Sequence, residues 1–453
     1  MRRVVKVSRI RIIITIIVVV LTTLLTGCTG KEPNEIAYVV ALGIDSTDDD
    51  NYKITIQYAN TTQISGGASE SGGKAGSEIV DNVTIEAPNI YAGVGLANNI
   101  VSKSFSMSHA KLIVFSKEIA EKGVKDMIET LVRSEEIRPD VFIAVANTTA
   151  NDYLTSVNPE MEVNPAQYYQ LIYQKNQLVG IPDGQLREFF TGLYTDNYDS
   201  ILPVAGVIEG AGGNSQNDDK GQSKESQNEG SEGSSESLDS FESKNSDENE
   251  KEKDAEKNTS KYEYDIKNYV GGETAIEKKN KAEAIGAAVF EKDKMVGELG
   301  EVETEICKML KGDYTYSYLT YYNNDTPDIP ITVKTTQQKK PKYKIDTDKK
   351  TVDIELYIES DLYSLPADYN VENKIEDFER DVANYTSSAC TEFINNFTKK
   401  YNSDILKLNE KMKYKFLTNN QYNWFKKNVG WSEYKFSVCT NFKVRRTGLI
   451  VRE

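Results

Sequence analysis

The only histidine of the chain, His109, is the first residue to test for catalysis, because imidazole is the usual general base near neutral pH. Ser106 and Ser108 precede it, but a nucleophile elbow requires G-x-S-x-G on a strand-to-helix turn, and the sequence contains no such segment. A histidine that leads into an apolar strand is usually a structural, hydrogen-bonding residue. We therefore expect His109 to be structural and assign no catalytic residue.

The residue types that hold metals and cofactors are equally sparse. A single histidine excludes multi-histidine zinc sites, and the four cysteines form no C-x-x-C pair. Gly93 and Gly95 make an isolated G-x-G without the third glycine of a dinucleotide-binding loop. The acidic segment 45–50 lacks the order of an EF-hand loop and fits a solvated turn. Carboxylates are too numerous to single out a glycosidase pair. We expect no metal and no cofactor.

The first 28 residues have the pattern of an export signal. Five cations and no acid lie within an N-terminal segment whose apolar run extends from Ile12 to Leu25. As a helix this run would be about 21 Å long, short of the roughly 30 Å of a bilayer core, which favours a signal peptide over a membrane span. The run ends in Leu25, Thr26, Gly27 and Cys28, which resembles the lipobox of bacterial lipoproteins.

In that class of proteins the cysteine thiol is diacylglycerated and becomes the N-terminus after cleavage. The resemblance implies that residues 1–27 are a signal peptide and that Cys28 is the lipidated residue. Two or more acyl chains anchor a protein stably, whereas one holds only marginally. The alternative is an uncleaved signal anchor with Cys28 close to the membrane surface. Either reading places the folded part outside the cytoplasm and beside a membrane.

The net charge of −16 is unevenly distributed along the chain. A nucleic-acid binder needs a positive field, and nothing after the first 27 residues supplies one, so no nucleic-acid partner is expected. Residues 211–260 contain 14 acids, six lysines and only two large apolar residues. Burial of so few apolar groups does not offset the entropy that the segment would lose on folding, so we expect a disordered acidic insert. We favour a neutral insertion over a functional spacer.

The elements that must position any site lie on both sides of this insert. In residues 28–210 we expect strands at 36–45, 52–60, 83–86, 111–116 and 140–146, and helices at 89–102 and 151–157. Apolar residues at 124, 127, 128 and 131 define one face of a further helix, whose first turn carries Glu118 and Glu121. Alternating strands and helices indicate a layered domain.

Residues 261–453 predict a second domain region of sheet and helix. A hairpin is expected at 287–299, helices at 302–310 and 375–393, and strands at 352–358 and 434–444. Cys307 and Cys390 fall in the helices and Cys439 in the last strand, so buried thiols are expected, with one cysteine pair left open. The predicted fold class is α+β: multidomain, with mixed or antiparallel sheets and long helices.

Three segments resemble the C-subunit family of spore nutrient germinant receptors, the Ger(x)C lipoproteins. The first is EIAYVVALGID at 35–45. The second joins Ser108-His109-Ala110-Lys111 to LVRSEEIR at 131–138. The third combines the hairpin at 287–297 with FKVRRTG at 442–448. Residues at motif positions of unproven role are His109, Lys111, Arg138, Arg445, Arg446 and Gly448. Family members commonly carry an F-G-F-G-like stretch before the final helix, where this chain has DILKLN at 404–409.

This resemblance implies a non-enzymatic subunit that is held by membrane lipid through Cys28 on the outer face of the cell membrane, the inner membrane of the spore. Its implied partners are the two integral membrane subunits of A and B type. The first alternative is a solute-binding lipoprotein of a transporter, which needs two similar lobes around a cleft, unlike the two dissimilar halves here. The second is an anchored hydrolase, for which the sequence offers no elbow and no metal cluster.

Overall fold

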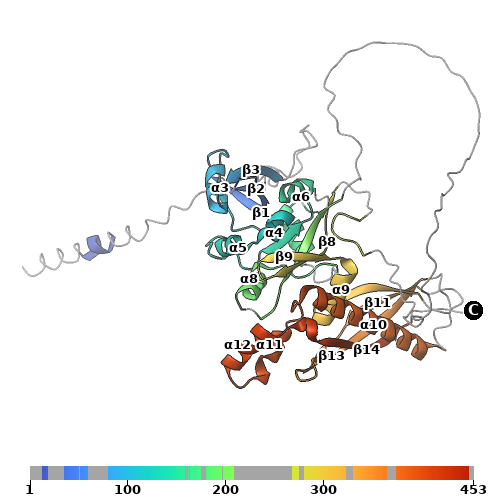
Figure 1. The fold of residues 1–453 in the computed structure, drawn as a ribbon. Helices are drawn as coiled ribbons and strands as arrows, with labels where there is room; N and C mark the ends of the chain where they lie inside the picture. The colour runs from blue at the N-terminus through green and yellow to red at the C-terminus, as the bar shows by residue number, and fades with distance from the viewer. Residues whose placement is uncertain are drawn as a thin grey trace, which may run out of the picture. The chain divides into compact units, whose positions relative to one another are not determined.

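The computed structural model describes residues 13–18, 35–49, 51–59, 80–158, 162, 164–174, 180–195, 197–208, 268–274, 280–322, 330–364 and 374–447 (Figure 1). The lipobox at 25–28 and the insert predicted at 211–260 lie outside these residues. Of the predicted signal peptide only 13–18 is described, and it is helical. No helix in the described part of the chain combines the length and hydropathy that crossing a bilayer requires.

A nine-stranded mixed sheet follows the order β3-β2-β1-β5-β6-β7-β8-β9, with β4 paired to β1. Parallel pairing joins β1 to β4 and β5, β5 to β6 and β6 to β7, whereas β2, β3, β8 and β9 pair antiparallel with their neighbours. The strands are β1 (Ile36–Ser46), β2 (Tyr52–Ala59), β3 (Val80–Ala87), β4 (Ser104–Ser106), β5 (Leu112–Ser116), β6 (Phe142–Ala146), β7 (Ile201–Val207), β8 (Ala282–Glu291) and β9 (Lys294–Leu299). β5 and β6 are buried throughout, as parallel strands covered on both faces must be.

Helices cover both faces of this sheet. One face packs on α3 (Ile90–Ala97), α4 (Lys117–Lys122), α5 (Lys125–Val132) and α8 (Leu186–Thr195), and the other on α6 (Ala150–Ser156) and α7 (Pro165–Gln174). The alternation of β5 explains the two cores, since Ile113 and Phe115 belong to the first and Leu112 and Val114 to the second.

The helix predicted from Glu118 to Leu131 is in fact two helices. Gly123 has a φ of +125°, a conformation that few other residues adopt, and it ends α4 two residues before α5 begins. Ser116 caps the start of α4 by accepting a hydrogen bond from the amide of Ile119 (3.3 Å). The predicted helix at 89–102 is also shorter, because α3 ends at Ala97.

The second sheet has five strands arranged around the long strand β13 (Thr351–Ser364). One side of β13 pairs antiparallel with β11 (Pro330–Gln337) and β12 (Lys342–Asp346), and its other side pairs parallel with β14 (Lys435–Arg446). β10 (Tyr316–Tyr322) extends the sheet beyond β11. The mixed pairing in both sheets confirms the predicted α+β class. Among the helices that the structure describes, only α10 (Ile375–Tyr401) is long, whereas the sequence predicted several long helices.

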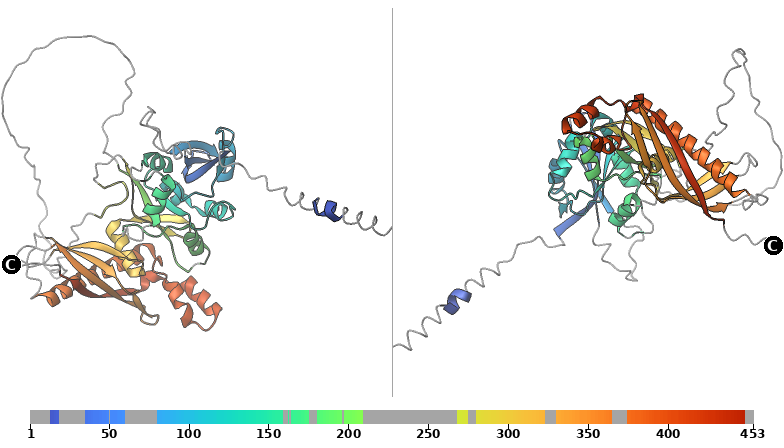
Figure 2. Two further views of the ribbon diagram at one scale, coloured as in Figure 1. Left: turned by 180° about the vertical axis from the view of Figure 1, so that it is seen from behind. Right: turned by 90° about the horizontal axis from the view of Figure 1, so that it is seen from below.

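Polar side chains of α10 bond to the free edge of β14, along which the helix lies (Figure 2). The side chains of Asn395, Thr391, Ser387 and Glu379 accept hydrogen bonds from the amides of Phe436 (3.1 Å), Val438 (3.0 Å), Thr440 (2.9 Å) and Val444 (2.9 Å), respectively. A spacing of four along the helix matches a spacing of two along the strand for the first three pairs. The contacts close an edge that would otherwise present unpaired amides to another chain.

The hairpin formed by β8 and β9 belongs to the first sheet, since β8 pairs with β7. The sequence divides the chain at the 211–260 segment, but the first sheet continues beyond that segment as far as Leu299. The physical reason is that β7 would otherwise be an open edge. α9 (Glu301–Lys311) follows, and Val289 and Leu299 share a core with Ile354 and Leu356 of β13.

The three described cysteines are unpaired thiols. Cys307 and Cys390 are buried, as predicted, and burial raises their pKa to about 11 and about 12. The expectation of a buried thiol is wrong for Cys439, which is exposed because it lies on the outward-facing side of the alternating strand β14.

Candidate functional site

The motif residues near His109 lie at the start of the first sheet. His109 is exposed, and its ring contacts the edge of Tyr38 at a centroid distance of 4.9 Å. The backbone of Lys111 links two strands, donating to the carbonyl of Val40 (2.9 Å) and accepting from the amide of Phe142 (3.0 Å). The Lys111 backbone thus has a positional role, and the structural reading of His109 stays a prediction.

The two halves of the second motif meet in space. The amide of Met107, just before Ser108, donates to the Glu136 carboxylate at 2.6 Å. Arg138 is exposed and makes a bidentate ion pair with Asp140, whose two oxygens each lie 2.9 Å from a guanidinium nitrogen. The hydrogen bond from Arg138 lowers the pKa of Asp140. The segment 107–140 is thus tied together locally.

The remaining motif residues lie on the other sheet or outside the described part. Arg445 pairs with Glu359 at 3.4 Å, and Arg446 is exposed at the end of β14. Gly448, Cys28 and the lipobox residues 25–27 are among the residues not described. The motif positions that the structure describes therefore do not converge on one site.

A polar groove instead lies where the loop after α8, the end of α9 and the segment 404–409 meet. A cavity of about 400 Å³ is lined by Asp183, Glu188, Tyr198, Lys311, Asp313 and Lys407, among others. A second cavity of about 490 Å³ adjoins it and shares Tyr198, Asp199 and Ser200. We call these two cavities together the polar groove.

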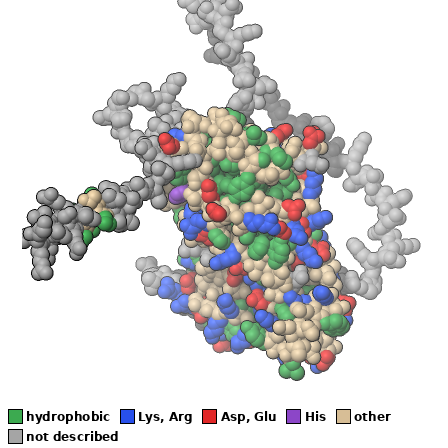
Figure 3. Space-filling model, turned by 90° about the vertical axis from the view of Figure 1, so that its left-hand side faces the viewer, with side chains coloured by type: hydrophobic (Ala, Val, Ile, Leu, Met, Phe, Trp, Pro, Cys, Tyr) green, Lys and Arg blue, Asp and Glu red, His purple; other side chains and the backbone are tan. Residues whose placement is uncertain are grey.

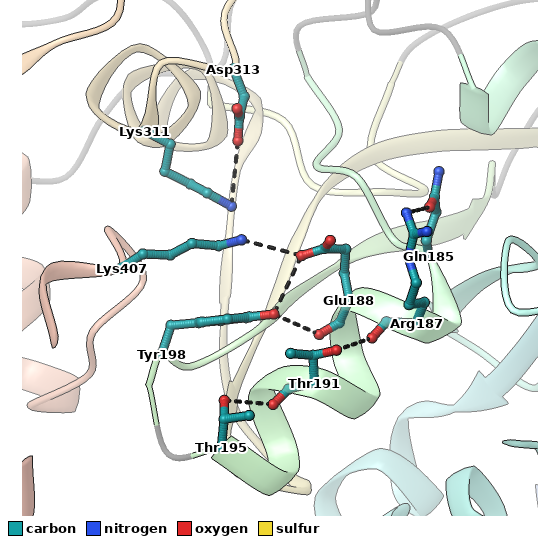
Figure 4. Close-up of polar contacts among 9 residues, drawn as sticks. All are labelled: Gln185, Arg187, Glu188, Thr191, Thr195, Tyr198, Lys311, Asp313 and Lys407. Atoms are coloured by element: carbon teal, nitrogen blue, oxygen red, sulfur yellow. Dashed lines mark hydrogen bonds and ion pairs between the residues drawn. The ribbon is translucent and has the colours of Figure 1, made fainter. Parts of the chain in front are cut away.

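Glu188 and Lys407 form the central ion pair of the polar groove, with Nζ 3.2 Å from Oε2 (Figure 4). The Tyr198 hydroxyl donates to the backbone carbonyl of Glu188 (2.9 Å) and contacts its carboxylate (3.3 Å), while the Lys407 ammonium lies 4.3 Å from the Tyr198 ring centroid. Burial alone would raise the pKa of Glu188, but the charge and hydrogen bond of Lys407 hold it below the usual value. Burial and the Glu188 charge raise the pKa of Tyr198, which remains a donor.

Local folding explains how these side chains are presented. Glu188 lies in the first turn of α8, which is fixed by the buried residues Leu186 and Phe189. Lys407 has a φ of +57°, which costs about 1 kcal/mol for a residue with a side chain. The Asp404 carboxylate compensates by accepting from the amides of Leu408 and Asn409, each at 2.7 Å.

The second cavity is where α12 (Asn419–Asn428) meets the loop after α8. The Tyr422 hydroxyl donates to the Asn197 side chain (3.0 Å), and the Lys426 ammonium donates to the Thr195 carbonyl (2.8 Å). The amide of Asp404 donates to the Asp199 carboxylate at 2.9 Å. Burial raises the pKa of Asp404 to about 7, against its backbone hydrogen bonds.

Paired charges and hydrogen bonds in the polar groove thus connect the loop after α8 to the segment 404–409 and to α12. Among the described residues, no group of three or more His, Cys, Asp or Glu side chains is placed to hold a metal ion. The sequence analysis missed Glu188 and Lys407 because 219 residues separate them, and neither lies in a pattern that signals the other. The one available signal was the departure from the family pattern at 404–409, which proves to form a wall of the groove.

Comparison with known proteins identifies both halves. Residues 30–207 match the domain family "Spore germination protein N-terminal domain" and residues 285–448 match "Spore germination B3/ GerAC like, C-terminal". Together the matches span about three quarters of the chain.

Two similar proteins come from Bacillus subtilis (strain 168). Spore germination protein KC of Bacillus subtilis (strain 168) is 26% identical over 174 residues, 35% of this chain and 42% of the relative. Spore germination protein B3 of the same organism is 26% identical over 148 residues, 30% of this chain and 36% of the relative. Both alignments thus span less than half of the relative. The crystal structure of the GerBC protein aligns over 89% of this chain and 96% of that one, with 15% identity and a TM-score of 0.48. Because an N-terminal and a C-terminal domain of the same germination proteins follow one another along the sequence, the chain belongs to the GerAC family of spore germination proteins.

Proposed function

We propose that the chain is the lipid-anchored, non-enzymatic C-type subunit of a nutrient germinant receptor. The observation that carries the proposal is the succession of both germination domains in one chain, which gives it the domain content that the family descriptions name. Its partners are integral membrane subunits of A and B type, and its site of action is the outer face of the membrane that becomes the inner membrane of the spore.

The anchor in this proposal is Cys28. The lipobox pattern at 25–28 places the lipidated cysteine eight residues before Ile36, where β1 begins. An acylated N-terminus accounts for membrane attachment of a chain whose described helices are too short or too polar to span a bilayer.

A non-enzymatic role fits the polar groove. Its central acid and base, Glu188 and Lys407, are engaged with each other, and the Asp199 carboxylate accepts a hydrogen bond from the amide of Asp404. Such a groove holds the subunit in one arrangement for assembly. The alternative, a solute-binding lipoprotein of a transporter, would bind an amino acid or sugar in equilibrium dialysis with the purified chain.

The test is membrane attachment in the sporulating host. Cys28→Ala should move the chain from the membrane to the soluble fraction and slow nutrient-triggered germination. Cys439→Ala is the matched control, because this exposed thiol lies on β14. Affinity purification of the parent chain from dormant-spore membranes should recover multi-span partners. Full membrane retention of Cys28→Ala would favour the signal-anchor alternative, and recovery of no multi-span partner would contradict the receptor assignment.

A further inference from the structure

The surface around α3 is apolar in a chain that is otherwise rich in charge. α3 reads IYAGVGLA, and residues 87–102 include no charged side chain, although charged residues make up 27% of the chain. One side of the helix is buried through Ile90, Val94 and Ala97. A helix that is apolar on every side is normally covered on every side.

The other side of α3 is exposed. Tyr91, Leu96 and Ile100 are 40%, 48% and 70% exposed, and we call these three residues the α3 surface. Figure 3 shows hydrophobic side chains gathered in the upper part of the face it displays, the height at which Figure 1 draws α3. Gly95 lies beside them with open space where a Cβ would stand.

The α3 surface lies close to the point where the chain enters the fold. The amide of Phe105 donates to the side chain of Asn98, directly after α3, at 2.8 Å. Phe105 pairs in register with Ala37 at the beginning of β1. The end of α3 is therefore held beside the first residues of the sheet.

The length of the preceding chain brings this end of the molecule to the membrane. Cys28 precedes Ile36 by eight residues, which span at most about 29 Å when fully extended. An acidic chain is repelled by anionic lipid headgroups, and an uncharged apolar surface is the part that approaches them most readily.

We propose that Tyr91, Leu96 and Ile100 of the α3 surface insert into the headgroup region of the bilayer that carries the chain. This inference rests on the lipid anchor of the proposed function. The contact is a second attachment to the membrane, in addition to the acyl chains. The anchor keeps the α3 surface at a high effective concentration beside the bilayer. It sets which end of the subunit faces the lipid.

Quenching of an introduced tryptophan by brominated lipid tests the contact. The lipidated full-length chain carrying Ile100→Trp is reconstituted into protein-free vesicles of phosphatidylethanolamine and phosphatidylglycerol, with or without bromine on the acyl chains. Leu417→Trp is the control, because Leu417 is 96% exposed and belongs to the other half of the fold. The native residues Trp424 and Trp431 contribute equally to both variants and are subtracted through the parent spectrum.

We expect brominated lipid to reduce the added emission of Ile100→Trp at least twofold and to leave that of Leu417→Trp unchanged. Leu96→Trp repeats the measurement at an independent position. Equal quenching of the test and control variants on vesicle-bound chain overturns the lipid contact and leaves the anchor intact. Failure of the lipidated chain to bind vesicles overturns the anchor and this inference together.

Discussion

Asn395 offers the sharpest test of how α10 protects the edge of the second sheet. Its side-chain amide accepts from the backbone amide of Phe436 (3.1 Å) and donates to the carbonyl of the same residue (2.9 Å), as a neighbouring strand would. Phe436 itself is fully buried. The change to make is Asn395→Leu, which keeps a side chain of similar size and removes both hydrogen bonds.

The expected loss follows from the two backbone groups left without a partner. Leaving a buried donor or acceptor unpaired costs about 1–3 kcal/mol each. The contact is partly buried, so water recovers some of this cost, and we expect Asn395→Leu to lower the free energy of unfolding by about 2–4 kcal/mol. A further hydrogen bond, to the Thr391 carbonyl at 2.7 Å, lies within the helix and adds less.

Urea denaturation of the full chain measures the loss, with tryptophan fluorescence as the signal. Asn396→Leu is the matched control, since Asn396 is the next residue of the same helix and is exposed. The control should change stability by no more than about 0.5 kcal/mol. If the two variants differ by less than that, the hydrogen bonds from α10 to β14 do not stabilise the edge, and the reasoning is refuted.

Two further predictions concern titration and the polar groove. Burial raises the pKa of Glu305 to about 7, against a hydrogen bond from Ser317. The folded chain therefore keeps a proton that the unfolded chain releases near pH 4.5. The contribution of this proton to the free energy of unfolding is complete below pH 4.5 and is lost as the pH rises through about 7. Between pH 4.5 and 8 the parent should lose at most about 3 kcal/mol of unfolding free energy through Glu305, and Glu305→Gln should not show this loss. An equal dependence of unfolding free energy on pH in parent and variant would contradict the prediction. Lys407→Met should lower the free energy of unfolding by about 1 kcal/mol at low salt and by less at high salt. Denaturation of Lys407→Met by itself and combined with Glu188→Gln measures this effect, and a cost independent of salt would speak against an electrostatic pair.

Elements with a clear hydrophobic period were predictable from the sequence. The stripe of α10 and the alternation of β14 are confirmed, because each element buries one face and leaves the other in solvent. The break at Gly123 was missed because the apolar spacing continues across it, while a positive φ interrupts the backbone. α8 escaped prediction because its buried face includes Gly192, which weakens the apolar stripe.

None of the central contacts of the polar groove could be predicted from the sequence. The motif residues His109 and Arg138 make local contacts, with the Tyr38 ring and the Asp140 carboxylate respectively, and neither lines the polar groove. The polar groove depends on the docking of segments that are distant along the chain, such as Glu188 and Lys407. Its pairings therefore had no signature at the level of spacing or composition.

The polar groove contributes more to the alignment of the two sheets than to the strength of their association. The Glu188–Lys407 side chains are 43% and 32% exposed, so solvent screens the pair, and its contribution is at most about 1 kcal/mol. Solvent does not weaken the apolar core that the sheets share in this way, because Val289 of the first sheet and Leu356 of the second are completely buried in one cluster. Burial of apolar surface is not directional, whereas hydrogen bonds and ion pairs require particular positions. Loss of one groove contact should therefore loosen the alignment of the sheets and leave them associated.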